Sequence, residues 1–104
     1  MERVAFKMKL KPGTALEYKQ RHDALWPELA AELHAAGVSD YSIFLDEETL
    51  TLFAVQKLSV GNSAAALPNS PIVRKWWSSM SLLMEVNPDQ SPVVSPLKEV
   101  FYLE

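Results

Sequence analysis

The sequence predicts an α+β fold with the element order βαββαβ. Four segments alternate between apolar and polar residues, two longer segments repeat with helical periodicity, and proline, glycine and short polar residues separate them. The chain has 104 residues, of which 48% are hydrophobic and 22% charged, which fits one domain covering residues 1–104 with one hydrophobic core. This order folds most simply as a ferredoxin-like split βαβ, with four antiparallel strands and both helices on one face of the sheet.

The four alternating segments are expected to be strands. They are residues 3–10, 41–45, 50–58 and 97–103, and the polar turn 46–49 makes the middle two an antiparallel hairpin. Apolar residues also occur on the second face of the sheet, because Ala5 follows Val4 and Phe44 follows Ile43. A second copy that packs sheet to sheet would cover this face, so we expect a two-fold homodimer.

The first helical segment follows Pro12-Gly13. Thr14 and Glu17 form a capping-box pattern, which predicts that a helix begins at about Ala15. Pro27 lies inside the segment and predicts either a kink at this point or a second helix with Pro27 in its first turn. Gly37 is expected to end the segment as a left-handed cap.

The second helical segment is expected to begin at Pro71, with Asn69 or Ser70 as its cap. Its apolar stripe consists of Val73, Trp76, Trp77, Met80 and Met84. Residues 59–67 have a weak pattern and predict at most a short helix.

The composition argues against several classes of protein. The net charge of −3 would repel a polyanion, so no nucleic-acid partner is expected. No apolar run approaches the length of a membrane span, and the start of the chain does not resemble a signal peptide, so we expect no membrane and a cytoplasmic protein. Cysteine is absent, which fits a reducing compartment. Metal-ligand spacing, a phosphate-binding glycine loop and a nucleophilic serine motif are also missing, so we expect neither a metal nor a phosphate site.

Two polar rings interrupt the apolar stripe of the first helical segment. The stripe consists of Tyr18, His22, Leu25, Leu29 and Leu33. His22 is the one side chain that both titrates near neutral pH and lies on an inward face, whereas His34 could face solvent or an interface. A lone histidine is often structural, but Tyr18 one turn away favours a pocket. The neighbours Arg21 and Asp23 point elsewhere on the helix and are expected to be solvated.

The pair Trp76-Trp77 is the second unusual feature. Adjacent helical residues cannot share one face, and both indoles are costly to expose. The pair is explained either by a wide core stripe or by an aromatic wall for a ligand. Tyr41 and Trp26 could extend such a wall, although each also suits ordinary packing. A pocket of this kind fits a neutral, hydroxylated or partly apolar ligand.

Several blocks of the chain resemble the L-rhamnose mutarotase family. The blocks are Tyr18, Arg21-His22, Trp26-Pro27-Glu28-Leu29, Trp76-Trp77, Asn87-Pro88-Asp89, Ser91-Pro92-Val93 and Glu99-Val100-Phe101-Tyr102-Leu103. The resemblance implies a dimeric α/β barrel of ferredoxin-like subunits. It also implies a cofactor-free cytoplasmic isomerase of rhamnose metabolism that interconverts the α and β anomers of L-rhamnose, a small neutral sugar.

The resemblance also implies residue roles. His22 would be the catalytic proton donor, and Tyr18, Tyr41, Trp76 and Trp77 would bind the sugar. The acid–base partner of His22 stays open between a tyrosine hydroxyl, a carboxylate such as Asp89, and water. Two other functions compete with this one. The first is a cofactor-free monooxygenase of the same barrel architecture. The second is a metabolite-sensing module, but such a module is normally attached to a DNA-binding domain, and this chain has no room for one.

Overall fold

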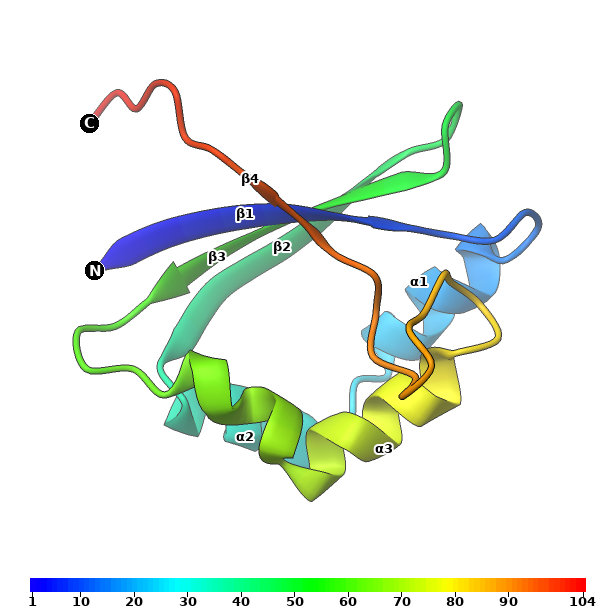
Figure 1. The fold of residues 1–104 in the computed structure, drawn as a ribbon, viewed down its shortest axis with the longest axis horizontal. Coiled ribbons are helices and arrows are strands. Elements are labelled where there is room, and N and C mark those ends of the chain that lie inside the picture. The colour runs from blue at the N-terminus through cyan, green and yellow to red at the C-terminus, as the bar shows by residue number, and fades with distance from the viewer.

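The chain forms a four-stranded antiparallel sheet with its helices on one face (Figure 1). The computed structural model describes all residues 1–104. The elements are β1 (Glu2–Lys9), α1 (Ala15–Asp23), α2 (Pro27–Ala35), β2 (Val38–Asp46), β3 (Thr51–Leu58), the 3₁₀ helix η1 (Ala64–Asn69), α3 (Pro71–Met80) and β4 (Ser95–Leu97). The strand order is β2-β3-β1-β4. Each βαβ unit therefore spans an intervening antiparallel strand, which confirms the predicted ferredoxin-like arrangement.

The core lies between the inner face of the sheet and the helices. In the strand register, Ala54 is opposite both Phe6 and Ile43, and Leu52 is opposite both Met8 and Leu45. The buried cluster consists of Met8, Leu10, Tyr18, Leu52, Ala54, Met80, Leu83 and Met84. The alternation in β1 thus points its apolar residues toward the helices, as its sequence predicts.

The first helical segment is two helices. α1 ends at Asp23, Trp26 has extended backbone angles, and Pro27 is the first residue of α2. Of the two predicted outcomes, the structure therefore has the restart, because proline favours the first turn and disfavours helical geometry in the residue before it. The predicted capping box is wrong: the Thr14 hydroxyl lies 2.8 Å from the carbonyl oxygens of Lys11 and Leu83 and does not cap α1.

Gly37 is required where α2 turns into β2. Its φ is +91°, and an added Cβ would lie 2.3 Å from the Ser59 hydroxyl oxygen and 2.8 Å from the Asn62 Cβ. A larger residue would therefore meet both backbone strain and a clash, which confirms the predicted left-handed cap.

α3 begins at Pro71, as the sequence predicts, and ends at Met80. Ser70 stands at the cap position, but the predicted cap is wrong for its side chain, because the Ser70 hydroxyl makes no hydrogen bond. Met84 was expected on the helical stripe and instead lies beyond the helix, where it is buried in a bridge with Leu10. Met84 is apolar because it is buried, and not because the helix continues to this residue. η1 supplies the short helix expected near residues 59–67.

The last strand is shorter than predicted. β4 covers three residues that pair with Ala5, Phe6 and Lys7, whereas the prediction placed a strand over residues 97–103. Beyond Leu97 the tail bends away from β1 (Figure 1). The Arg3 guanidinium packs over the Tyr102 ring, 4.0 Å from its centroid. The expected strand 97–103 is therefore wrong for the single chain. The prediction failed because apolar alternation does not reveal whether a neighbouring strand is present to pair with.

The outer face of the sheet, which no helix covers, carries a band of apolar side chains. Phe44 is opposite Phe53, and Val55 is opposite Ala5, which in turn is opposite Leu97. Phe44 keeps 65% of its surface exposed. This band is where the sequence predicted apolar residues on the second face.

Candidate active site

Tyr18 and His22 lie one turn apart on α1, with ring centroids 4.3 Å apart. Tyr18 is buried and His22 is half-buried. The His22 Nδ1 is 2.9 Å from the Tyr18 carbonyl oxygen. A carbonyl only accepts hydrogen bonds, so Nδ1 donates and keeps its proton. The Nε2 atom of His22 is therefore the one that gains and loses a proton.

Burial lowers the pKa of His22 below the ordinary histidine value of 6.5. The hydrogen bond to Tyr18 and the charge of Asp23 act in the opposite direction but are weaker. The ring is therefore mostly neutral at neutral pH, and its protonated form is a stronger acid than an exposed imidazolium.

Trp76 of α3 continues the aromatic row. Its ring meets His22 edge to face at 5.3 Å, and Trp26 meets Trp76 in the same way at 5.1 Å, both with interplanar angles of 87°. The structure thus brings together Tyr18, His22, Trp76 and Trp26 from three separate segments. Trp77 is half-buried on a neighbouring side of α3 and makes no ring contact with this row.

Tyr18 and Tyr41 supply the two phenol hydroxyls of the candidate site, and the Tyr41 phenol influences the pKa of Tyr18. Burial, and secondarily the interaction with Tyr41, raises the pKa of Tyr18. Tyr41 is 38% exposed as a residue, but burial around its hydroxyl raises the pKa of this phenol too, against a weaker effect of a hydrogen bond with Gln56. The Tyr18 hydroxyl makes no hydrogen bond within the chain and is not sealed from solvent. Both phenols therefore remain protonated and can donate hydrogen bonds to a ligand.

Gln56 was missed in the sequence reading. It follows Leu52 and Ala54 on the inner face of β3, where a polar side chain is out of place. That break in the apolar pattern is the signal that the sequence offers, because a half-buried amide on an apolar face calls for a hydrogen-bonding partner.

The charged neighbours of His22 differ from each other. Asp23 is exposed and pairs with Lys19 at 2.9 Å, as expected for a solvated residue. The expectation for Arg21 is wrong: it is half-buried and donates to the Ser79 carbonyl oxygen of α3. Asp89 lies exposed on a turn, where hydrogen bonds from Ser91 lower the pKa of its carboxyl.

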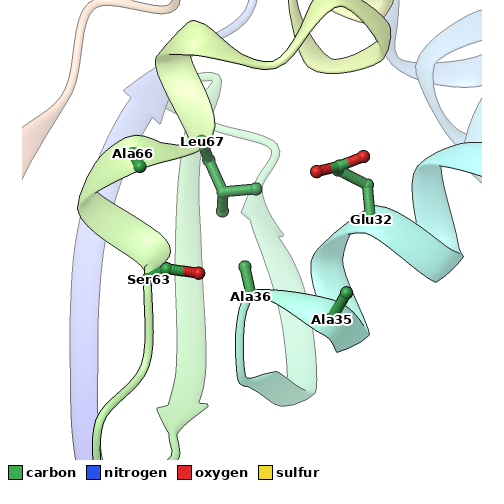
Figure 2. A pocket seen from close by; sticks show the side chains of 6 residues that line it. All are labelled: Glu32, Ala35, Ala36, Ser63, Ala66 and Leu67. Atoms are coloured by element: carbon green, nitrogen blue, oxygen red, sulfur yellow. The ribbon is translucent and has the colours of Figure 1, made fainter.

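Two hollows open on the surface near the helices. One, of about 300 Å³, is lined by Arg21, Ala24, Trp26, Trp76 and Ser79. The other, of about 180 Å³, lies between α2 and η1 and is lined by Glu32, Ala35, Ala36, Ser63, Ala66 and Leu67. Figure 2 shows that small side chains line much of this second hollow and that the Glu32 carboxylate points toward Leu67. None of the predicted site residues lines it, so the first hollow is the one beside the aromatic row.

No group of three or more His, Cys, Asp or Glu side chains is arranged to hold a metal ion. Likewise, none of the helices has the length and apolar character needed to cross a bilayer.

The model of the family described as L-rhamnose mutarotase matches residues 3–103. The chain belongs to the L-rhamnose mutarotase family. An L-rhamnose mutarotase from Formosa agariphila is 60% identical over the whole of both chains, and one from Bacteroides thetaiotaomicron is 56% identical, also over the whole of both. The resemblance read from the sequence blocks is confirmed.

Solved structures extend the comparison. A crystal structure of L-rhamnose mutarotase from Formosa agariphila superposes with a TM-score of 0.93 at 59% identity, covering all of both chains. A conserved protein from Methanosarcina mazei superposes with a TM-score of 0.61 at 17% identity, covering 93% of this chain and 90% of the other, which shows a shared fold alone. None of these relatives is named as a monooxygenase, so the competing monooxygenase prediction is not supported.

Proposed function

We propose that this chain is an isomerase that interconverts the α and β anomers of L-rhamnose. Membership of the L-rhamnose mutarotase family supports the reaction and the substrate. The structural observation that carries the proposal is the His22 imidazole, which has its Nδ1 fixed on the Tyr18 carbonyl and its ring against Trp76. This arrangement leaves one titrating nitrogen in an aromatic-lined site.

In the proposed reaction the sugar ring opens and closes. A base takes the proton of the anomeric hydroxyl, the bond from C1 to the ring oxygen breaks, and the protonated Nε2 of His22 gives its proton to that ring oxygen. The aldehyde then rotates about the C1–C2 bond. The ring closes on the other face of C1, while His22 takes its proton back and the anomeric oxygen is protonated again. General acid–base catalysis of this kind contributes about 10²–10⁴-fold.

The residues around His22 have complementary parts in this proposal. Trp76 and Trp77 would cover the C–H face and the methyl group of the sugar, while the hydroxyls of Tyr18 and Tyr41 would donate hydrogen bonds to it. The raised pKa values keep both phenols protonated, so no phenolate is available to act as the base. Asp89 is exposed on its turn. Water is therefore our choice of base for the anomeric hydroxyl.

Magnetisation exchange between the anomeric protons of L-rhamnose tests the proposal by NMR. We expect catalytic amounts of the protein to raise the exchange rate above that of the same buffer without protein. An exchange rate equal to the buffer control would refute the proposed function. Heat-denatured protein at the same concentration is the control for catalysis by free side chains.

The pH dependence tests the direction of proton transfer. Because burial lowers the pKa of His22, its protonated fraction is still growing as the pH falls below neutrality. We therefore expect kcat/KM, corrected for the buffer reaction, to rise by up to about tenfold per unit from about pH 8 downward and to level off only below about pH 6.5. A rate that falls over this range would instead make the neutral Nε2 the required form and His22 the base.

The outer apolar band supports the proposal of a homodimer. Phe44 and Leu97 are exposed on a sheet face that no helix covers, and a second copy would bury them. We expect Phe44→Asp to convert a dimer into a monomer in light scattering, because the carboxylate would be desolvated at the interface. Val60→Asp is the matched control, since Val60 is 90% exposed at the turn after β3. A wild-type monomer, or a Phe44→Asp dimer, would contradict this proposal.

We also propose a cytoplasmic location. The chain has no cysteine, so its stability does not depend on disulfides and suits a reducing compartment. Cell fractionation of the native host, with detection by antibody, tests the location, and recovery outside the cytoplasmic fraction would overturn it.

A further inference from the structure

α1 is weakly buried for the element that carries the candidate proton donor. It has nine residues, and Tyr18 is the one that is buried in the core. A helix of this length is marginal without tertiary contacts, so its position depends on the few side chains that join it to the rest of the chain. The position of His22 therefore depends on those same contacts.

Arg21 joins α1 to the carboxyl end of α3. Its guanidinium donates to the carbonyl oxygen of Ser79, lies 4.0 Å from the Met80 sulfur and pairs with Glu17 one turn earlier on α1. The last four carbonyls of a helix have no partner within it, and Ser79 lies in the last turn of α3. α3 has no basic residue of its own in that turn. The positive charge that the carboxyl end of α3 favours is thus supplied by α1.

Ser79, which accepts the hydrogen bond from Arg21, is also hydrogen-bonded to Trp76. The Ser79 hydroxyl donates to the Trp76 carbonyl oxygen at 2.7 Å, so one residue of α3 contacts both Arg21 and the backbone of the tryptophan. Trp76 meets His22 on one side, and on another it borders the hollow of about 300 Å³ that Arg21 also lines. On the side of this hollow no further side chain packs between the two helices, so the Arg21 link supplies a restraint there that packing does not.

We propose that Arg21 is a positioning residue that holds His22 against Trp76 by bridging α1 to the carboxyl end of α3. The guanidinium suits this task because its planar fork can bind a carbonyl and a carboxylate at the same time. The proposal rests on the proposed function, in which His22 is the proton donor. Arg21 itself touches neither the sugar nor the reacting atoms in this scheme.

Arg21→Ala tests the proposal with two readouts. We expect kcat for anomer exchange to fall by about tenfold or more while KM changes by less than about threefold, because a misplaced acid affects the chemical step. We also expect the pKa of His22 to rise toward the ordinary value of 6.5, because α1 moves away from Trp76 and the ring is more solvated. The chain has two histidines, so the ¹³C-edited NMR spectrum has two imidazole Cε1–H signals, and His34→Ala assigns them.

Two further variants separate positioning from general stability. Lys19→Ala removes the exposed Lys19–Asp23 pair of the same helix and is expected to leave kcat and the His22 titration unchanged. Arg21→Lys keeps a cation that reaches one acceptor but not both, so it is expected to restore part of kcat and part of the pKa shift. Circular dichroism of each variant checks the fold.

The possible results are decisive. Wild-type kcat and an unchanged His22 titration in a folded Arg21→Ala protein would overturn the proposal. If Arg21→Ala does not fold, wild-type values in Arg21→Lys would show a purely structural role and would overturn it as well, whereas reduced kcat with a raised His22 pKa would support it. If the wild-type protein catalyses no anomer exchange, the proposed function fails, and the His22 titration alone still judges whether Arg21 positions the ring.

Discussion

Replacing His22 with alanine is expected to lower the catalysed rate of anomer exchange by about 10²–10⁴-fold, the usual contribution of a general acid. The reason is geometric. The Tyr18 carbonyl holds Nδ1, so Nε2 is the group that can pass a proton to the ring oxygen. Neither phenol of the candidate site titrates near neutral pH, since the pKa values of Tyr18 and Tyr41 are both raised.

The fold is expected to survive this substitution. His22 is half-buried and lies outside the buried core cluster, and alanine is the best helix former for its position on α1. Circular dichroism should therefore be unchanged, and the loss should appear in kcat. Magnetisation exchange of the anomeric protons measures it.

His34→Ala is the matched control for His22→Ala. His34 is the only other histidine, and it is exposed in the last turn of α2. Its replacement is expected to leave the exchange rate unchanged, because nothing places it near the aromatic row. A His22→Ala protein with wild-type kcat would assign the proton donor to another group, and a similar loss in both variants would show that neither effect is specific.

Local patterns predicted most of the fold because the interactions that decide it are local. Alternation in β1 and β3 selects the inner face, and Pro27 fixes the restart of the helix. The polar turn predicted at 46–49 does join the two strands of the hairpin, but one residue later, at 47–50. Predictions failed where distant backbone groups compete. Thr14 has the right spacing for a capping box, but the carbonyl of Leu83, 69 residues away, approaches its hydroxyl. In the same way, strand pairing beyond Leu97 depends on a neighbour that alternation cannot reveal.

The part of the candidate site that lies on one face of α1 could be predicted from the sequence. Tyr18 and His22 are adjacent on α1, and the sequence stripe places them together. The contact of His22 with Trp76 required the three-dimensional packing of α1 on α3. Arg21 was misjudged for a related reason: its partner is a backbone carbonyl 58 residues away, and a carbonyl has no signature in the sequence.

Replacing Trp76 with alanine is expected to have the second large effect, on KM through the lost sugar contact and on kcat through the lost support of the His22 ring. If a sugar face covers about 80 Å² of the indole, its loss costs about 2 kcal/mol, or about 30-fold in kcat/KM. The same change removes the edge contact with His22 and exposes that ring, so the pKa of His22 is expected to rise. Anomer exchange at increasing L-rhamnose concentration, together with the NMR titration of His22, measures both effects.

Two further variants, Trp76→Phe and Lys75→Ala, separate loss of the aromatic sugar-binding face from a general disturbance of α3. A phenyl ring keeps an aromatic face beside His22, so Trp76→Phe is expected to recover most of kcat/KM. Lys75 is the exposed neighbour on α3, and Lys75→Ala is expected to change neither KM nor the His22 pKa. Wild-type KM in a folded Trp76→Ala protein would remove Trp76 from the sugar-binding wall. A raised His22 pKa with an unchanged KM would leave it only the role of shielding the imidazole from water, because that result separates burial of the acid from contact with the sugar.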